Sequence, residues 1–233
     1  ATRDLCGILL PDSGRLQEEQ ADYANRHAFS KHHPALPLYT EEDAHRALQH
    51  LVALDFLQET QIGEMRFRLL PSGHIPGASL IELREGEKRL VFSGDIGRPD
   101  DPIMASPAEL EGADYLVLES TYGNRRHATL DAKQALGDII RKTAHRGGVV
   151  VIPAFAVGRT QLLLYYIHLL KAEGAIPDLP VYLNSPMAVE ATRVFYRHHA
   201  EHRLTPEQCE AINRVAKIVH TAEDSKRLNQ RKG

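Results

Sequence analysis

Residues 116–123, Leu116-Val117-Leu118-Glu119-Ser120-Thr121-Tyr122-Gly123, place an acidic residue where a short apolar run ends in a loop. Two earlier segments follow the same pattern: residues 72–77 are Ser-Gly-His-Ile-Pro-Gly, and residues 92–97 are Phe-Ser-Gly-Asp-Ile-Gly. Apolar runs of this length predict β-strands, and neighbouring strands bring the loops at their ends to one edge of a sheet. We therefore expect His74, Asp95 and Glu119 to lie close together.

The residue types in these three loops indicate metal chemistry. Glycines beside His74 and Asp95 let the backbone come close to whatever the side chains hold. An imidazole together with a carboxylate suits a borderline divalent ion such as Zn²⁺. Each residue alone is a weak signal, because a loop histidine is usually a surface side chain and Gly-Asp is usually a turn. The three segments in this order are a stronger signal, with His74 and Asp95 as candidate metal ligands.

The sequence around these loops predicts two halves of different organisation, with a boundary near Ser120. The first half is expected to hold a helix over 43–58 after the N-cap candidate Thr40, and a short helix opening at the capping box Ser106–Glu109. Its predicted strands cover residues 65–69, 79–83, 89–92 and 114–119. In the second half, strands over 149–152, 181–183 and 217–219 alternate with helices. This spacing of βαβ units predicts a parallel sheet.

Composition excludes several classes of protein. Apolar residues make up 42% of the 233 residues, and no apolar run approaches the ~20 residues of a membrane-spanning helix. Only two cysteines occur, Cys6 and Cys209, far apart in the sequence. This small number excludes a disulfide scaffold and a cysteine-based zinc module. It also favours a reducing compartment, so we expect a cytoplasmic protein.

The charge is divided unevenly along the chain. Residues 1–118 hold 11 Lys and Arg against 20 Asp and Glu, a net charge of −9. Residues 119–233 hold 17 against 11, a net charge of +6. A basic half suits a polyanionic partner, because each neutralised phosphate releases counterions. Charge alone favours the simpler interpretation of solvated helix faces.

The three loops resemble motifs of a known family. Residues 73–77, 93–97 and 118–123 resemble the third motif, the fourth motif and motif A of the metallo-β-lactamase-fold nucleases of the β-CASP family. Ribonuclease J and the pre-mRNA 3′-end processing endonuclease belong to this family, and residues 151–161 and 181–192 also match its segments. The resemblance implies an α/β protein. Residues 1–120 would form part of a metallo-β-lactamase αββα sandwich, and residues 121–233 part of a Rossmann-like, parallel-sheet β-CASP domain.

The resemblance also implies an activity and the roles of three catalytic candidates. His74 would bind zinc, Asp95 would bridge two zinc ions, and Glu119 would support a catalytic histidine that family members supply later in the chain. The implied reaction is hydrolysis of RNA phosphodiester bonds by a metal-activated hydroxide. The β-CASP half would hold single-stranded RNA over that site.

One family motif is missing from this sequence. Family members carry His-x-His-x-Asp-His, whereas no two of the 13 histidines here are separated by two positions. We therefore expect an internal fragment of a β-CASP nuclease, with most zinc ligands absent. Such a fragment would bind zinc poorly and would not cleave RNA as given. An apolar sheet surface left uncovered near residues 65–92 would favour self-association.

Four further residues are candidates for RNA binding. Arg159 follows Gly158 at a predicted helix N-terminus, where backbone N–H groups and a guanidinium can hold a phosphate. Ser185 is a candidate contact to the RNA backbone, although N-capping explains it without a function and is the simpler interpretation, which we favour. Arg125 and Arg126 line an RNA groove in one interpretation and are ordinary loop charges in the other. His198, His199 and His202 have a spacing that suits a metal, but we interpret them as a solvated face.

Two alternatives to a nuclease stay open at this stage. One is a catalytically inactive β-CASP paralogue that binds RNA or scaffolds a processing complex, against which the presence of His74, Asp95 and Glu119 argues. The other is a small-molecule hydrolase of the metallo-β-lactamase fold, against which the βαβ pattern after Glu119 argues. The residues encoded upstream of Ala1 would discriminate, since His-x-His-x-Asp-His there indicates a nuclease. The sequence does not distinguish an endonuclease from a 5′ exonuclease.

Overall fold

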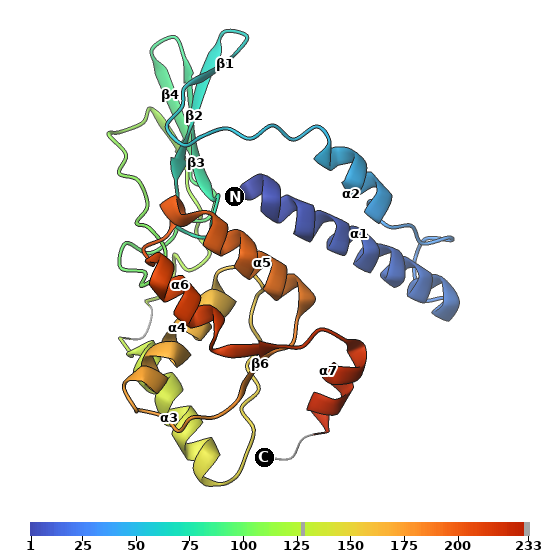
Figure 1. Ribbon diagram of the computed structural model, residues 1–233. Helices are drawn as coiled ribbons and strands as arrows, with labels where there is room; N and C mark the ends of the chain where they lie inside the picture. Colours follow the sequence, from blue (N-terminus) through green and yellow to red (C-terminus); the bar gives the residue numbers. More distant parts are fainter. Residues whose placement is uncertain (127–128, 231–233) are drawn as a thin grey trace. The chain divides into compact units, whose positions relative to one another are not determined.

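A computed structural model describes residues 1–126 and 129–230 of the chain. It divides into two compact units, Ala1–Leu54 and Asp55–Gly233 (Figure 1). The two units meet between Leu54 and Asp55, not near Ser120. The domain boundary near Ser120 therefore stays a prediction. No helix in the described part of the chain is long and apolar enough to cross a membrane.

The first unit consists of two packed helices, α1 (Thr2–His27) and α2 (Glu41–Leu48). Gly14 of α1 allows a close approach, because a Cβ there would lie 2.7 Å from the backbone of Thr40 and Glu41. Thr40 caps α2 as predicted, in a capping box with Asp43. The helix ends at Leu48, well before the predicted residue 58. The apolar residues beyond it do not pack, as the exposure of Val52 and Leu57 shows, and a helix depends on such packing.

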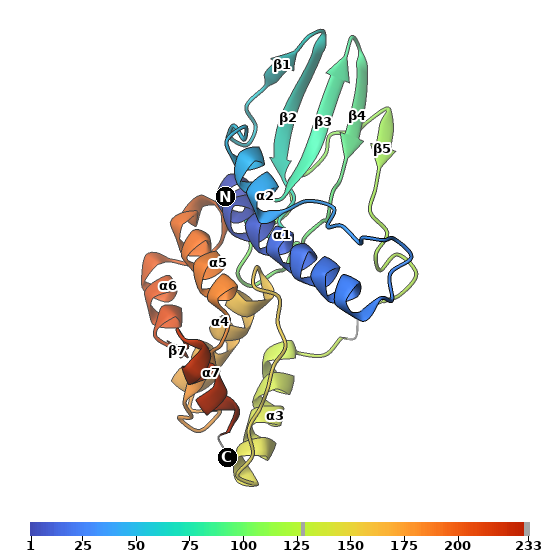
Figure 2. The ribbon, with the colours of Figure 1, turned by 90° about the vertical axis from the view of Figure 1, so that its right-hand side faces the viewer.

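The second unit begins with a five-stranded sheet, whose strands lie side by side in chain order (Figure 2). The strands are β1 (Thr60–Ile62), β2 (Met65–Pro71), β3 (Ser79–Glu85), β4 (Lys88–Phe92) and β5 (Tyr115–Val117). The first four pair antiparallel, and β5 pairs parallel to β4. Strands are thus found in all four segments predicted in this region, and β1 is an addition. As a result β2, β4 and β5 all run in the same direction.

The two faces of this sheet differ. One face packs Leu70, Leu80 and Val91 into a small core with Ala108 and Leu110. The other face carries two cross-strand rows of apolar residues, Phe67-Leu83-Leu90-Tyr115 and Leu69-Ile81-Phe92-Val117. In the second row, Ile81, Phe92 and Val117 are exposed. The apolar surface expected near residues 65–92 is therefore present, while self-association through it stays a prediction.

The rest of the second unit is mainly helical. Its elements are α3 (Ala132–His145), α4 (Arg159–Ala172), β6 (Val181–Leu183), α5 (Pro186–Arg197), the 3₁₀ helix η1 (His199–Glu201), α6 (Pro206–Asn213), β7 (Ala216–Ile218) and α7 (Ala222–Asn229). Strands β6 and β7 pair in parallel, as predicted for this half. The main core joins α4, α5 and α6 to residues 103–104, around the fully buried Phe195 and Ile212.

Two predicted elements are wrong. Residues 149–152 are not a strand, and Val151 is 82% exposed. An apolar run becomes a strand only beside a partner that takes up its backbone hydrogen bonds. No helix follows Ser106, because its hydroxyl donates to the Pro99 carbonyl and accepts from Arg203 instead of capping.

The chain is a mixed α/β protein, but the αββα sandwich stays a prediction. Apart from the five-stranded sheet, residues 1–126 and 129–230 contain one other sheet, the two-stranded β6–β7. Of the expected sandwich, the structure thus contains one sheet, the five-stranded sheet that carries the three loops.

Candidate functional site

The three candidate catalytic residues follow three strands that run in the same direction. His74 lies after β2, Asp95 after β4 and Glu119 after β5. Because these strands share a direction, their carboxyl ends lie at one edge of the sheet, called here the strand-end rim. The rim consists of the loops 72–77, 93–97 and 118–123.

His74 and Asp95 meet at this rim. His74 Nε2 lies 3.7 Å from Asp95 Oδ2, and both side chains are exposed to solvent. The two ligand atoms are close enough to contact the same ion, because metal–ligand bonds of about 2 Å put neighbouring ligands about 3–4 Å apart. The exposure leaves room for a substrate to approach them. The structure thus brings together the two residues that the sequence marked as metal ligands.

A close backbone contact holds these two loops together. The N–H of Gly97 donates to the carbonyl oxygen of Ser72 at 2.8 Å. A Cβ at residue 97 would lie 2.0 Å from the carbonyl oxygen of Gly73, so only glycine fits. Gly73 itself has φ +69°, a left-handed conformation that L side chains rarely adopt. The glycines that flank His74 and Asp95 therefore position the loops against each other.

Glu119 is tied to the loop that carries Asp95. Its backbone N–H donates to Ser93 Oγ at 2.9 Å, and its Oε1 accepts from the N–H of Ile96 at 2.8 Å. The pKa of Glu119 is lowered, chiefly by the Ile96 N–H, with hydrogen bonds from Thr121 and the nearby His74 contributing less. Glu119 is therefore ionised at neutral pH. It fixes the backbone next to Asp95.

The rim supplies part of a metal site. Imidazole and carboxylate are the right donor types for Zn²⁺, but catalytic zinc normally has three protein ligands. Within residues 1–126 and 129–230, no third His, Cys, Asp or Glu forms a compact ligand group with His74 and Asp95. The two residues fit a zinc ion as two of its ligands.

The helical part of the second unit is fastened to the strand-end rim. The N–H of Gly77 donates to the carboxylate of Glu201. Gly158 lies beside Ile75, since a Cβ there would be 3.1 Å from Ile75 Cγ2. The N-terminus of α4 and the 3₁₀ helix η1 therefore both contact the loop that carries His74. The role of Glu201 had no signal in the sequence, because it lies 124 positions from its partner.

The basic candidates for RNA binding have different surroundings. Arg159 is exposed at the start of α4, with its guanidinium 5.9 Å from the ring centroid of the exposed Phe155. Arg125 lies 5.9 Å from the ring centroid of Tyr122, and Arg126 is exposed. An arginine beside an exposed aromatic ring is an arrangement that suits a phosphate and a base.

Ser185 has a structural role. Its Oγ accepts from the N–H of Ala188 at 3.2 Å and caps α5, whose first residue is Pro186. The simpler of the two interpretations of Ser185 thus accounts for its conformation.

The interpretation of His198, His199 and His202 as a solvated face is wrong for His202. This side chain is buried at 7% exposure and stacks on Phe195, with ring centroids 4.4 Å apart. The 3₁₀ helix η1 breaks the helical spacing on which that interpretation rested, because α5 ends at Arg197.

Comparisons with known proteins show what the chain is similar to. Residues 160–233 match the family model of the Beta-Casp domain. The chain is similar to Ribonuclease TTHA0252 of Thermus thermophilus, with 32% identity over 69% of this chain and 37% of that protein. It is also 31% identical to Probable RNase MJ4 of Methanocaldococcus jannaschii, over 80% of this chain and 43% of that protein.

A plant cleavage and polyadenylation factor is similar as well. Cleavage and polyadenylation specificity factor subunit 3-I of Arabidopsis thaliana is 31% identical over 68% of this chain and 23% of that protein. The chain thus spans less than half the length of these three relatives.

Proposed function

The chain belongs to the β-CASP family of metallo-β-lactamase-fold ribonucleases, and we propose that its function is zinc-dependent hydrolysis of phosphodiester bonds in single-stranded RNA. The observation that carries this proposal is the meeting of His74 and Asp95 at 3.7 Å, with Glu119 bound to the backbone beside Asp95. In this proposal residues 1–120 are the metallo-β-lactamase part and residues 121–233 the β-CASP part.

Each rim residue has a distinct task in the proposed reaction. His74 and Asp95 would hold zinc, which when bound supplies a hydroxide at neutral pH and neutralises charge on phosphate oxygens. Glu119 acts as a positioning residue, because its ionised carboxylate holds the Ile96 N–H and so fixes the loop of Asp95. The exposure of His74 and Asp95 lets a phosphodiester reach them from solvent.

The basic half would bind the RNA chain. Arg159 lies at the end of α4 that contacts the loop of His74, so a phosphate held there is close to the rim. Phe155 offers an exposed ring on which a base can stack. Arg125 and Arg126 come six and seven positions after Glu119 along the chain and would extend the basic surface. Ser185 would support this RNA-binding part only indirectly, by capping α5.

The comparisons favour a nuclease over the two alternatives. The similar proteins are named as ribonucleases and RNA-processing factors, which argues against a small-molecule hydrolase. An inactive paralogue would bind RNA without cleaving it at the strand-end rim, so a cleavage assay distinguishes it from a nuclease. A cytoplasmic location is proposed from the two free thiols, Cys6 and Cys209.

Replacing Asp95 tests the catalytic role of the rim. Asp95→Asn in the complete open reading frame that encodes this chain is expected to lower RNA cleavage by about 10–100-fold, because the amide is a poor zinc ligand. Binding of the same RNA should stay unchanged. The measurement is cleavage of a labelled single-stranded RNA with added Zn²⁺.

Asp100→Asn is the matched control, since this exposed aspartate lies outside the rim loops. Wild-type cleavage by the Asp95→Asn protein would refute the catalytic assignment. RNA binding by the wild-type protein without any cleavage would favour the inactive paralogue.

Removing the basic side chains near the rim tests the RNA surface. The triple change Arg125→Ala, Arg126→Ala and Arg159→Ala is expected to weaken single-stranded RNA binding about tenfold or more at low salt. The slope of log K against log salt should fall by about 2, because each lost phosphate contact of a single strand removes about 0.7. Fluorescence anisotropy at several salt concentrations measures both quantities.

A charge-matched control comes from three exposed lysines elsewhere in the basic half. Lys142→Ala, Lys217→Ala and Lys226→Ala remove the same charge from other surfaces. Equal losses of affinity in the two triple variants would show that net charge, and not the proposed surface, binds the RNA.

A further inference from the structure

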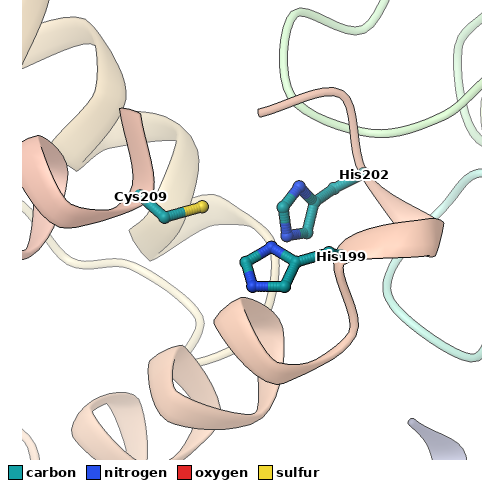
Figure 3. A group of neighbouring side chains, drawn as sticks. All are labelled: His199, His202 and Cys209. Atoms are coloured by element: carbon teal, nitrogen blue, oxygen red, sulfur yellow. The ribbon is translucent and has the colours of Figure 1, made fainter. Parts of the chain in front are cut away.

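Three metal-ligating side chains gather away from the strand-end rim. His199 begins η1, His202 follows its end, and Cys209 lies on α6 (Figure 3). Each offers one ligand atom, and these atoms all lie within 4.8 Å of one another. Figure 3 shows the two imidazole rings next to each other, with the sulfur of Cys209 directed toward them. The set of two imidazoles and one thiol is called here the His/His/Cys cluster.

His202 gives an independent sign that this cluster binds a ligand. The side chain is buried at 7% exposure, and its Nε2 atom has no hydrogen-bond partner. A buried polar atom without a partner is unfavourable by about 1–3 kcal/mol, so native proteins rarely leave one. The ring is held rigidly by stacking on Phe195, at 4.4 Å and 4° between planes.

The other ring nitrogen of His202 is on the backbone side. Nδ1 accepts a hydrogen bond from the backbone N–H of Leu204 at 3.2 Å, and the ring also interacts with the carbonyl of Phe195. A metal-binding histidine commonly donates its second ring N–H to a backbone carbonyl. Metal binding at Nε2 would place the ring proton on Nδ1, in place of the hydrogen bond that Nδ1 accepts from Leu204.

The protonation states of the cluster suit a metal ion. Burial, with His199 nearby, lowers the pKa of His202, so this imidazole is neutral at neutral pH. Burial raises the pKa of the Cys209 thiol, which is 5% exposed. The thiol would lose its proton when a divalent cation binds, as thiol ligands do.

We propose that His199, His202 and Cys209 bind one Zn²⁺ ion, with water as the fourth ligand on the exposed side of His199. Two imidazoles and a thiolate are a donor set that zinc prefers, whereas Mg²⁺ and Ca²⁺ prefer oxygen. Tetrahedral zinc places its N and S ligands about 3.5 Å apart, so the cluster has to contract slightly. Small rotations of the three side chains would supply this contraction.

The position of the cluster gives the ion a structural role. It would join the turn after α5 to α6, and this turn contains Glu201. Glu201 holds the N–H of Gly77 in the loop of His74. Zinc at the cluster would therefore stabilise the contact between the β-CASP part and the strand-end rim, without taking part in the chemistry there.

Cobalt binding tests the proposal, because a Co²⁺–thiolate bond gives a charge-transfer band in the near ultraviolet. The metal-free 233-residue chain is titrated with Co²⁺, and one ion per chain with this band is expected. Cys209→Ser should abolish the band, while Cys6→Ser, the control for the other free cysteine, should retain it. His199→Ala, at an exposed position, should weaken Co²⁺ binding at least tenfold while the fold stays intact.

Further measurements separate this site from the proposed catalytic one. The double variant His74→Ala, Asp95→Asn should keep the Co²⁺–thiolate band. In a separate measurement, Zn²⁺ should raise the midpoint temperature of unfolding of the wild type more than that of His199→Ala. The absence of the band in the wild type, its persistence in Cys209→Ser, or its loss in the double variant would each overturn the proposal.

Discussion

Replacing Glu82 by glutamine is expected to lower the free energy of unfolding by about 3–5 kcal/mol, the range found when one partner of a buried ion pair is removed. Glu82 on β3 is 1% exposed. It accepts hydrogen bonds from Arg68 at 2.8 Å, Arg84 at 3.0 Å and Arg89 at 2.7 Å. Glutamine has nearly the same volume, so the loss reports the charge and its hydrogen bonds, not a cavity.

The pKa of Glu82 makes this loss depend on pH. Burial opposes ionisation, but the three guanidinium groups outweigh it and lower the pKa from 4.5 to about 2. A carboxylate whose pKa is lower in the folded state stabilises the protein above the unfolded pKa, and this stabilisation is lost as pH falls. The difference between wild type and Glu82→Gln should therefore shrink by up to about 3 kcal/mol between about pH 5 and pH 2.

Urea denaturation of both proteins at several pH values measures this difference. Glu87→Gln is the control, because Glu87 is exposed in the turn between β3 and β4. We expect it to change the stability by less than about 0.5 kcal/mol. A Glu82→Gln protein as stable as the wild type at pH 7 would show that the ion pairs between the three arginines and this carboxylate do not stabilise the fold.

Replacing Gly97 by alanine is expected to lower the unfolding free energy by about 3 kcal/mol and to separate His74 from Asp95. The new Cβ would lie 2.0 Å from the carbonyl oxygen of Gly73 and 2.7 Å from the N of His74. Both obstacles are backbone atoms, so no change of rotamer relieves the overlap, and the two rim loops have to move apart. The Gly97–Ser72 hydrogen bond would break with them.

Hydrogen exchange of the backbone N–H groups in residues 72–78 and 95–97, together with urea denaturation, measures both effects. Gly7→Ala is the control, since a Cβ there has no atom within 4 Å. It lies inside α1, where alanine is favoured over glycine by up to about 1 kcal/mol. Unchanged exchange in the two loops of Gly97→Ala would contradict the close backbone contact.

Local patterns in the sequence predicted much of this structure. Thr40 caps α2 as predicted, through contacts with Asp43 three positions away. Strands β2, β3 and β4 follow apolar periodicity in one continuous stretch with short connections. Such features depend on neighbours in the chain, so a single sequence contains the information needed to place them.

Other features depended on partners that no local pattern identifies. The run Val149–Ile152 has strand-like residues but no neighbouring strand, and Ser106 has a capping pattern but bonds Pro99 and Arg203 instead. The buried position of His202 likewise follows from η1 and from stacking on Phe195. In each case the tertiary contact outweighed the local preference.

For the candidate site, the sequence by itself determined which residues are candidate ligands and which loops carry them. His74, Asp95 and Glu119 each follow an apolar run, and this pattern can be read directly from the sequence. Only the tertiary structure decided that Gly97 meets Gly73, that Glu201 holds Gly77, and that His199, His202 and Cys209 form a cluster. The Glu201–Gly77 contact joins residues 124 positions apart, and chain connectivity does not specify which distant groups meet. Packing of the strands and helices does, because it places each element against the one surface that fits it.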